Sequence, residues 1–303
     1  MIAPALELRT TRGTIELGGR PWLMGIVNAT PDSFSDAGEQ RTLEDRVALA
    51  RSLLDAGADL IDIGGESGVT NRPPVTPQEE IGRVVPLIER VAGELGALVS
   101  VDTYKPDVAR AAIAAGAAIV NDVSGLRDTG LADVCAQTGA GLVLMHTRAA
   151  PKQKLLDPGL DATIVRDVSE FLSERITVAT ERGVAFEQLM LDPGPDFGKT
   201  PWQTIQVMRA IGDLHALGRP VLLAVSRKDF VGAITSRPPR ERLAGTLAAV
   251  SHGVAAGAHV LRVHDLVHVA DFLAVEAVLN GHAELEQDAR LVEELRRQQG
   301  PAA

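Results

Sequence analysis

The sequence predicts a single (β/α)8 TIM barrel with a short N-terminal β-hairpin. Short apolar runs alternate with longer segments of helical periodicity over most of the 303 residues, which is typical of parallel β/α units. The runs number eight, and no long crossover reverses the strand order, so a closed barrel is favoured over an open doubly wound sheet. The length agrees, because such a barrel needs about 250 residues in one domain.

The pattern divides the chain into three segments. Residues 1–21 form a hairpin segment, in which Gly13 and the pair Gly18 and Gly19 mark turns. Residues 22–281 form the barrel, and residues 282–303 form a charged tail or helix with only sparse leucines.

The eight apolar runs are the predicted barrel strands. Most of them follow a glycine-containing turn, such as residues 56–58 or 115–117, where a helix is expected to end. The runs are residues 22–27, 60–63, 98–101, 118–120, 142–145, 189–191, 221–225 and 260–263. Between them, Thr42, Thr76 and Thr200 have the spacing of helix N-caps, because acidic or amide side chains follow in the first turn.

Composition and charge narrow the class of protein. The content of 45% hydrophobic and 23% charged residues is ordinary for a globular enzyme. A net charge of −10 without a long basic run argues against a nucleic-acid partner. No apolar stretch reaches the roughly 18 residues of a membrane span, and the N-terminus has no leader pattern. Cys135 is the only cysteine, so a reducing, cytoplasmic setting without a membrane is expected.

Polar residues follow the ends of the predicted strands. In a (β/α)8 barrel the carboxyl ends of the strands form the active site, so these residues are expected to converge. Asp102, Asn121 and Asp192 would form an acidic floor, while Lys228, Arg262 and His264 would gather on neighbouring strands beside Asn28. Such a site suits a molecule with a donor-rich heterocycle at one end and a phosphate group at the other, because carboxylates accept paired N–H donors and cations neutralise phosphate.

The strand-end motifs are similar to those of one known family. Residues 23–36, LMGIVNATPDSFSD, closely resemble the first motif of dihydropteroate synthases. Further matching segments follow in the family's order, so that the resemblance spans most of the chain from residue 23 to residue 281. They are residues 62–67, 100–103, 121–125, 145–146, 192–194, 197–199, 225–228 and 262–265.

The resemblance implies condensation of p-aminobenzoate with 6-hydroxymethyl-7,8-dihydropterin diphosphate, giving 7,8-dihydropteroate and diphosphate in folate biosynthesis. It also implies a homodimer formed through late helices, for which residues 266–279 are apolar enough, and Mg²⁺ as a cofactor.

The family's functional residues can be carried over position by position. Catalysis would depend on Asp102, Asp192, Lys228 and Arg262. The pterin ring would be held by Asp102, Asn121, Asp192 and Lys228 with Met145 and Phe197, the diphosphate by Asn28, Arg262 and His264, the Mg²⁺ by Asn28, and p-aminobenzoate by Thr70, Arg72, Ser226 and Arg227.

Two departures from the family pattern keep alternatives open. The loop at residues 65–74 reads GESGVTNRPP where the family usually reads Gly-Glu-Ser-Thr-Arg-Pro, and Asp196 stands where a glycine normally passes close to the pterin. The first alternative is a catalytically weak or non-catalytic pterin-binding paralogue. The second is a pterin-dependent methyltransferase domain, which would leave the diphosphate-side residues without a role.

Overall fold

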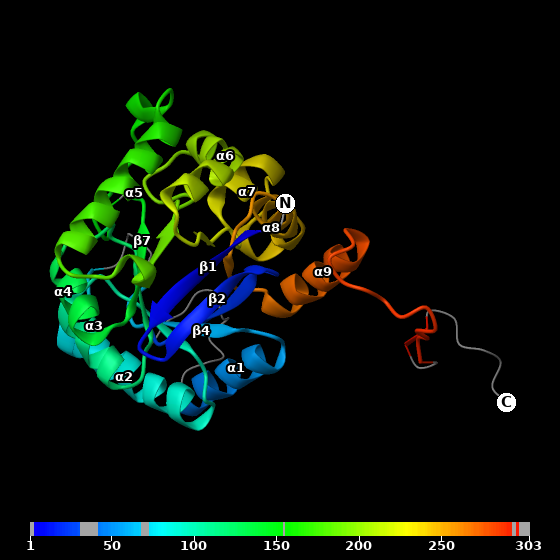
Figure 1. The fold of residues 1–303 in the computed structure, drawn as a ribbon, viewed down its shortest axis with the longest axis horizontal. Helices are drawn as coiled ribbons and strands as arrows, with labels where there is room; N and C mark the ends of the chain where they lie inside the picture. Colours follow the sequence, from blue (N-terminus) through cyan, green and yellow to red (C-terminus); the bar gives the residue numbers. More distant parts are fainter. Residues whose placement is uncertain (1–2, 31–41, 68–72, 154, 293–294, 297–303) are drawn as a thin grey trace.

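The chain folds into a parallel β-barrel surrounded by helices (Figure 1), as the sequence predicts. The computed structural model describes residues 3–30, 42–67, 73–153, 155–292 and 295–296. The sheet order is β8-β7-β6-β5-β4-β3-β10-β9, and a parallel bridge between Leu191 and Val221 links β8 to β9. The barrel strands are β3 (Trp22–Asn28), β4 (Leu60–Gly64), β5 (Val99–Asp102), β6 (Ile119–Asp122), β7 (Gly141–Met145), β8 (Leu189–Asp192), β9 (Leu222–Leu223) and β10 (Val260–Val263).

Helices cover the outside of the barrel. The α-helices are α1 (Leu43–Asp55), α2 (Pro77–Glu94), α3 (Pro106–Ala114), α4 (Gly130–Thr138), α5 (Ile164–Glu181), α6 (Pro201–Arg209), α7 (Asp229–Thr235), α8 (Leu243–Ala255) and α9 (Leu266–Leu279). Short 3-10 helices are η2 (Pro158–Leu160), η3 (Phe186–Gln188), η4 (Ile211–Leu217) and η5 (Pro239–Glu241). After α9, residues 282–292 are exposed and form no helix, and Figure 1 shows them running away from the barrel.

The predicted helix caps are present. The side chains of Thr42, Thr76 and Thr200 each accept a hydrogen bond from a backbone N–H in the first turn of α1, α2 and α6. After α3 the chain turns at Gly116, which has φ +115°, and the N–H of Ala117 donates back to the carbonyl of Ala112. Such turns bring the chain directly into the next strand.

The N-terminal hairpin closes the end of the barrel where the strands begin. Strands β1 (Ala3–Thr10) and β2 (Gly13–Gly19) pair antiparallel, and Leu8 and Leu17 pack in one core cluster with Met24 and Met190. The guanidinium of Arg219 donates to the backbone carbonyls of Glu7 and Leu189, tying the hairpin to β8. The opposite end, where the strands finish, is left for the site.

Candidate functional site

The strand ends place predicted site residues side by side. In the register of β3 to β6, Asn28 lies beside Gly64, Gly64 beside Asp102, and Asp102 beside Asn121. On the other side, Met145 of β7 lies beside Asp192 of β8.

Asp62 and Arg262 connect these residues across the barrel. Arg262 Nε donates to Asp62 Oδ2 at 2.7 Å, and its Nη2 donates to Asp102 Oδ2 at 3.0 Å. The amide nitrogen of Asn121 donates to the same Asp62 oxygen at 3.2 Å. Arg262 therefore lies within the acidic group. We expected the carboxylates on one side of the site and the cations on the other. Arg262 departs from this expectation, because burying a guanidinium is costly unless carboxylates pair with it.

The pKa of Asp102 is set by its partial burial and by its charged neighbours. Burial raises its pKa to about 7, the guanidinium of Arg262 acts in the opposite direction, and the neighbouring carboxylate of Asp62 adds to the rise. The carboxylate of Asp102 is thus held at the border between its charged and neutral forms near neutral pH, where a donor-rich ligand favours the charged form.

The loop after β8 is folded tightly against β7. Asp192 Oδ1 accepts from the N–H of Gly194 at 2.7 Å, and burial raises the pKa of this carboxyl group. Gly194 has φ +61°, and a Cβ there would come within 2.2 Å of the carbonyl oxygen of His146. Lys199 Nζ donates to the carbonyls of His146, Gly194 and Phe197. This buried lysine therefore holds the loop after β8 against the end of β7. Burial lowers the pKa of Lys199 to about 7.

Phe197 and Lys228 face each other across two loops. The Nζ of Lys228 lies 4.2 Å from the centroid of the Phe197 ring, a cation–π contact. Burial lowers the pKa of Lys228, while the carboxylates of Asp196 and Asp192 oppose this change. Asp196 itself directs its carboxylate to Thr204 and to the start of α7, so the departure from the family's glycine adds new hydrogen bonds.

Ser226 and Arg227, expected on the p-aminobenzoate side, follow β9, and His264, expected on the diphosphate side, follows β10. Ser226 Oγ accepts from the backbone N–H of His264 at 3.2 Å, joining the two loops. Arg227 forms a two-pronged ion pair with Asp265, with Nε donating to Oδ2 at 2.9 Å. Thr70 and Arg72 lie outside the described residues.

An ion-pair cluster that sequence reasoning missed anchors the base of the loop after β4. Lys105 Nζ contacts the carboxylates of Glu66 and Glu80, each at 2.5 Å, and the hydroxyl of Tyr104 also donates to Glu66. Lys152, from the loop after β7, lies 3.2 Å from Glu66. No local motif marks this cluster, because its members come from α2 and from the loops after β4, β5 and β7.

Asp62 is the other omission, and for this residue the sequence does hold a signal. Its side chain is fully buried inside β4, within the otherwise apolar run at residues 60–63. A carboxylate in a buried strand is costly unless it is paired, so it indicates a partner across the barrel.

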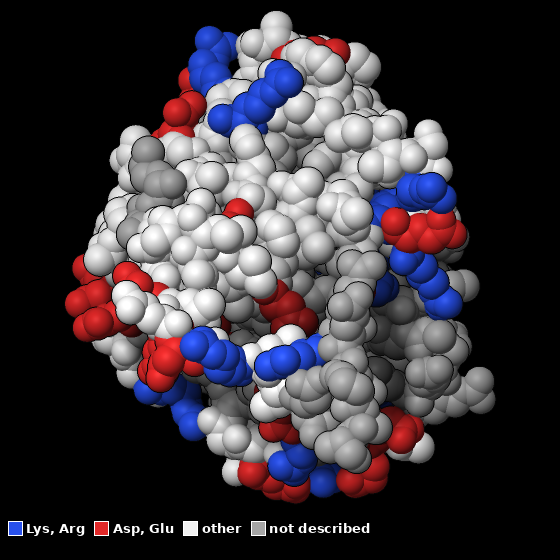
Figure 2. Space-filling view, turned by 90° about the vertical axis from the view of Figure 1, so that its right-hand side faces the viewer, with Lys and Arg blue, Asp and Glu red and all other residues white. Residues whose placement is uncertain are grey.

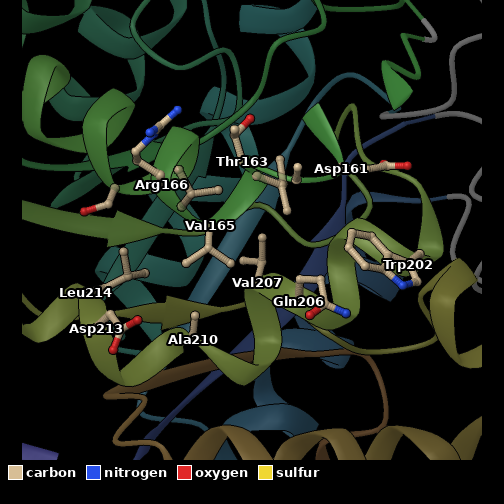
Figure 3. Close-up of a pocket in the computed structure, with 14 residues that line it drawn as sticks. Asp161, Thr163, Val165, Arg166, Trp202, Gln206, Val207, Ala210, Asp213 and Leu214 are labelled. Atoms are coloured by element: carbon tan, nitrogen blue, oxygen red, sulfur yellow. The ribbon is translucent and has the colours of Figure 1, made fainter. Parts of the chain in front are cut away.

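A cavity of about 590 Å³ lies apart from the strand ends, between the start of α5 and α6 (Figure 3). Its lining is largely apolar, with Trp202 at one end and Arg166 and Asp213 toward the other. None of the strand-end residues described above lines it, so it is separate from the candidate site.

Comparison with known proteins decides the family. The pterin-binding enzyme family matches residues 24–264. The dihydropteroate synthase of Bacillus subtilis is 42% identical over 260 residues, which cover 85% of this chain and 88% of that protein. The Escherichia coli dihydropteroate synthase is 38% identical over 261 residues, covering 86% of this chain and 92% of the relative. The chain belongs to the dihydropteroate synthase family.

Solved structures of dihydropteroate synthases superpose on this chain. The Xanthomonas albilineans enzyme with 4-aminobenzoic acid has a TM-score of 0.81 at 41% identity, covering 90% of this chain and 98% of the other. The Burkholderia cenocepacia enzyme complexed with 7,8-dihydropteroate has a TM-score of 0.82 at 36% identity, covering 93% and 98%. Among the described residues of this family member, no helix combines the length and apolar character that crossing a bilayer requires.

Proposed function

We propose that this chain is a transferase that condenses 6-hydroxymethyl-7,8-dihydropterin diphosphate with p-aminobenzoate, giving 7,8-dihydropteroate and diphosphate in folate biosynthesis. One observation carries the proposal: carboxylate and amide groups are gathered with the largely buried guanidinium of Arg262 at the strand ends of a dihydropteroate synthase barrel. Related enzymes of this name have been solved with 4-aminobenzoic acid and with 7,8-dihydropteroate, the co-substrate and product of this reaction.

We assign the residues to three subsites. The pterin subsite combines buried acceptors with two flanking side chains that contact each other, Phe197 and Lys228. The diphosphate subsite lies where β3 and β10 end. The assignments are Asp102, Asn121, Met145, Asp192, Phe197 and Lys228 for pterin, Asn28, Arg262 and His264 for diphosphate, and Thr70, Arg72, Ser226 and Arg227 for p-aminobenzoate.

The chemistry needs stabilisation of charge more than proton transfer. The bond between the methylene carbon and the diphosphate oxygen breaks with its electron pair on the oxygen, and Arg262 and His264 neutralise that charge. Asp102 and Asp192 hold the ring while it gains cationic character, and Lys228 lies at the same subsite. The p-aminobenzoate nitrogen then forms a bond to the carbon, and its proton passes to the released diphosphate or to water. No side chain acts as a nucleophile.

Mg²⁺ fits as a cofactor shared between protein and substrate. The described residues contain no group of three or more His, Cys, Asp or Glu side chains that could hold a metal. Mg²⁺ usually takes few protein ligands and completes its shell with substrate phosphates and water, so the amide oxygen of Asn28 suits this mode. The ion would neutralise diphosphate charge as a Lewis acid.

We further propose a homodimer through α9. This helix exposes Val267, Val275, Val278 and Leu279, and the side chain of Val275 is 60% exposed. Figure 2 views the molecule from the side toward which α9 extends in Figure 1, and uncharged residues cover much of this face. A second copy of this surface would cover it symmetrically.

We also propose a cytoplasmic setting and an undivided barrel over residues 22–281, with residues 1–21 and 282–303 as appended segments. Cys135, the only cysteine in the sequence, is a buried thiol in α4, so no disulfide forms within the chain, as is typical of proteins of a reducing compartment.

A steady-state assay tests the function. Purified protein is supplied with pterin diphosphate, p-aminobenzoate and Mg²⁺, and the release of diphosphate and the formation of dihydropteroate are followed together. Equal amounts of both products are expected. Pterin binding without either product would contradict the proposal in favour of a non-catalytic paralogue.

A further inference from the structure

Asp196 occupies a backbone conformation that glycine favours. It lies in the loop between β8 and α6 with φ +64°, between Gly194 at φ +61° and Gly198 at φ +62°. A side chain in the left-handed region is strained, although aspartate tolerates it better than most residues. A compensating interaction is therefore expected, and the carboxylate makes several.

The carboxylate of Asp196 caps a helix that belongs to another loop. Its Oδ2 accepts from the backbone N–H groups of Asp229 at 2.5 Å and Phe230 at 3.3 Å, the first two residues of α7. The residue in the N-cap position of α7, Lys228, makes no side-chain cap hydrogen bond. Asp196 thus supplies the acceptor that the helix start requires, from 33 residues away in the chain.

Thr204 holds the carboxylate in this orientation. Its Oγ1 donates to Asp196 Oδ1 at 3.1 Å and accepts from the N–H of Asp196 at the same distance. Thr204 lies in α6 and is fully buried. The carboxylate is therefore fixed at both oxygens, one toward α6 and one toward α7.

This arrangement links two residues of the pterin subsite. Phe197 follows Asp196 directly, and Lys228 directly precedes Asp229. The Phe197 ring and Lys228 Nζ are in contact at 4.2 Å. The cap therefore joins the two backbone segments that carry this pair.

We propose that Asp196 is a positioning residue that holds Phe197 and Lys228 together as one wall of the pterin subsite. The inference deepens the proposed function and rests on its pterin subsite. Asp196 touches α7 and α6 and is not itself a catalytic residue. Its role is to hold the two loops, before substrate binds, at the spacing that the pterin ring requires.

Three variants test the role. Asp196→Gly suits the left-handed backbone but removes the cap, and Asp196→Asn keeps an oxygen that can accept from α7. Asp229→Asn is the matched control, because it removes one negative charge from the same helix start, leaves the backbone cap in place and keeps an Oδ1 that can accept from Arg242, as the carboxylate does at 2.9 Å. Calorimetry gives the Kd for pterin diphosphate in the absence of p-aminobenzoate, and hydrogen exchange reports on the amides of Asp229 and Phe230.

The expected results differ between the variants. Asp196→Gly should raise the Kd about tenfold, the loss expected when a charge-assisted hydrogen bond no longer pre-orients a binding wall. The amides at positions 229 and 230 should exchange faster in the same variant. Asp196→Asn should keep the Kd within about threefold of the wild-type value, because an amide oxygen caps a helix nearly as well as a carboxylate. KM for pterin diphosphate should follow Kd, with a smaller change in kcat.

An unchanged Kd in Asp196→Gly would overturn the inference, as would an equal rise in Asp229→Asn. Failure of the proposed function has a different signature. A wild-type protein that binds pterin diphosphate but forms no dihydropteroate contradicts the synthase reaction, whereas the Kd values still decide the role of Asp196.

Discussion

At the scale of single residues, Arg262 connects the charges of the site. Its side chain is only 20% exposed and pairs with two carboxylates, Asp62 and Asp102. One guanidinium thereby offsets the buried carboxylate of Asp62 and the partly exposed carboxylate of Asp102 while remaining next to the expected diphosphate side. The residue types at the strand ends indicate which charges converge, but only the geometry shows that Arg262 bonds the acidic group directly.

Arg262→Ala should destabilise the protein as well as weaken substrate binding. Removing the guanidinium leaves Asp62 and Asp102 without their counter-charge, so the free energy of unfolding should fall by about 3 kcal/mol, the lower end for a broken buried pair because Asp102 can take up a proton. Urea unfolding followed by circular dichroism measures this loss. Arg262→Lys, which keeps the charge, should lose less. A change below about 1 kcal/mol in Arg262→Ala would show that the pair contributes little.

At the scale of elements, sequence patterns predicted the strands and helix starts well. Thr42, Thr76 and Thr200 cap their helices because each cap depends on neighbours within one turn. Strand β9 is shorter than the apolar run at residues 221–225. At its start, the N–H of Val221 donates to the ring of His259 and not to a strand carbonyl, a contact that no local pattern predicts.

The apolar surface of α9 carries its own prediction. Val275→Glu, a charge placed in the centre of the proposed interface, should convert the dimer to a monomer in sedimentation velocity experiments, since an unpaired charge is costly to bury. Leu285→Glu, an equally drastic change at an exposed position beyond the helix, should leave the dimer intact. If the wild-type protein sediments as a monomer at micromolar concentration, the proposed dimer is wrong.

At the scale of the whole molecule, the hairpin and the barrel depend on each other through His259. This residue precedes β10, and its Nδ1 accepts from the N–H of Val221 while its Nε2 lies 3.0 Å from the carbonyl oxygen of Pro4 in β1. The pair of contacts requires the neutral ring with its proton on Nε2. Burial lowers the pKa of His259 to about 4, which keeps the ring neutral at physiological pH.

Acidification should therefore loosen the fold. Between the unfolded pKa of about 6.5 and the folded pKa of about 4, the unfolded chain binds more protons at His259, so the free energy of unfolding falls as the pH falls. From pH 7 to pH 5 this residue alone should account for about 2 kcal/mol. The pKa of His146 is also lowered, whereas that of Asp102 is raised, so these groups contribute to the pH dependence as well. Comparison with His259→Asn isolates the contribution of His259.

Urea unfolding of the wild type and of His259→Asn at the two pH values provides the measurement. The difference between pH 7 and pH 5 should be smaller in the variant. An identical pH dependence in both proteins would mean that His259 does not link acidification to the closing of the barrel end.

The amino-acid sequence by itself determined the barrel, the hairpin, the family and several of the polar residues that follow the strands, although not Asp62. These follow from short-range periodicity and from the rule that parallel strands finish at one edge. Only the tertiary structure decided which of these side chains pair. Arg262 meets Asp62 and Asp102 from 200 and 160 residues away, and Asp196 caps α7 from a different loop. Such contacts depend on which side chains the closed barrel brings within hydrogen-bonding distance, and on the exclusion of water that strengthens them. No local sequence pattern encodes either condition.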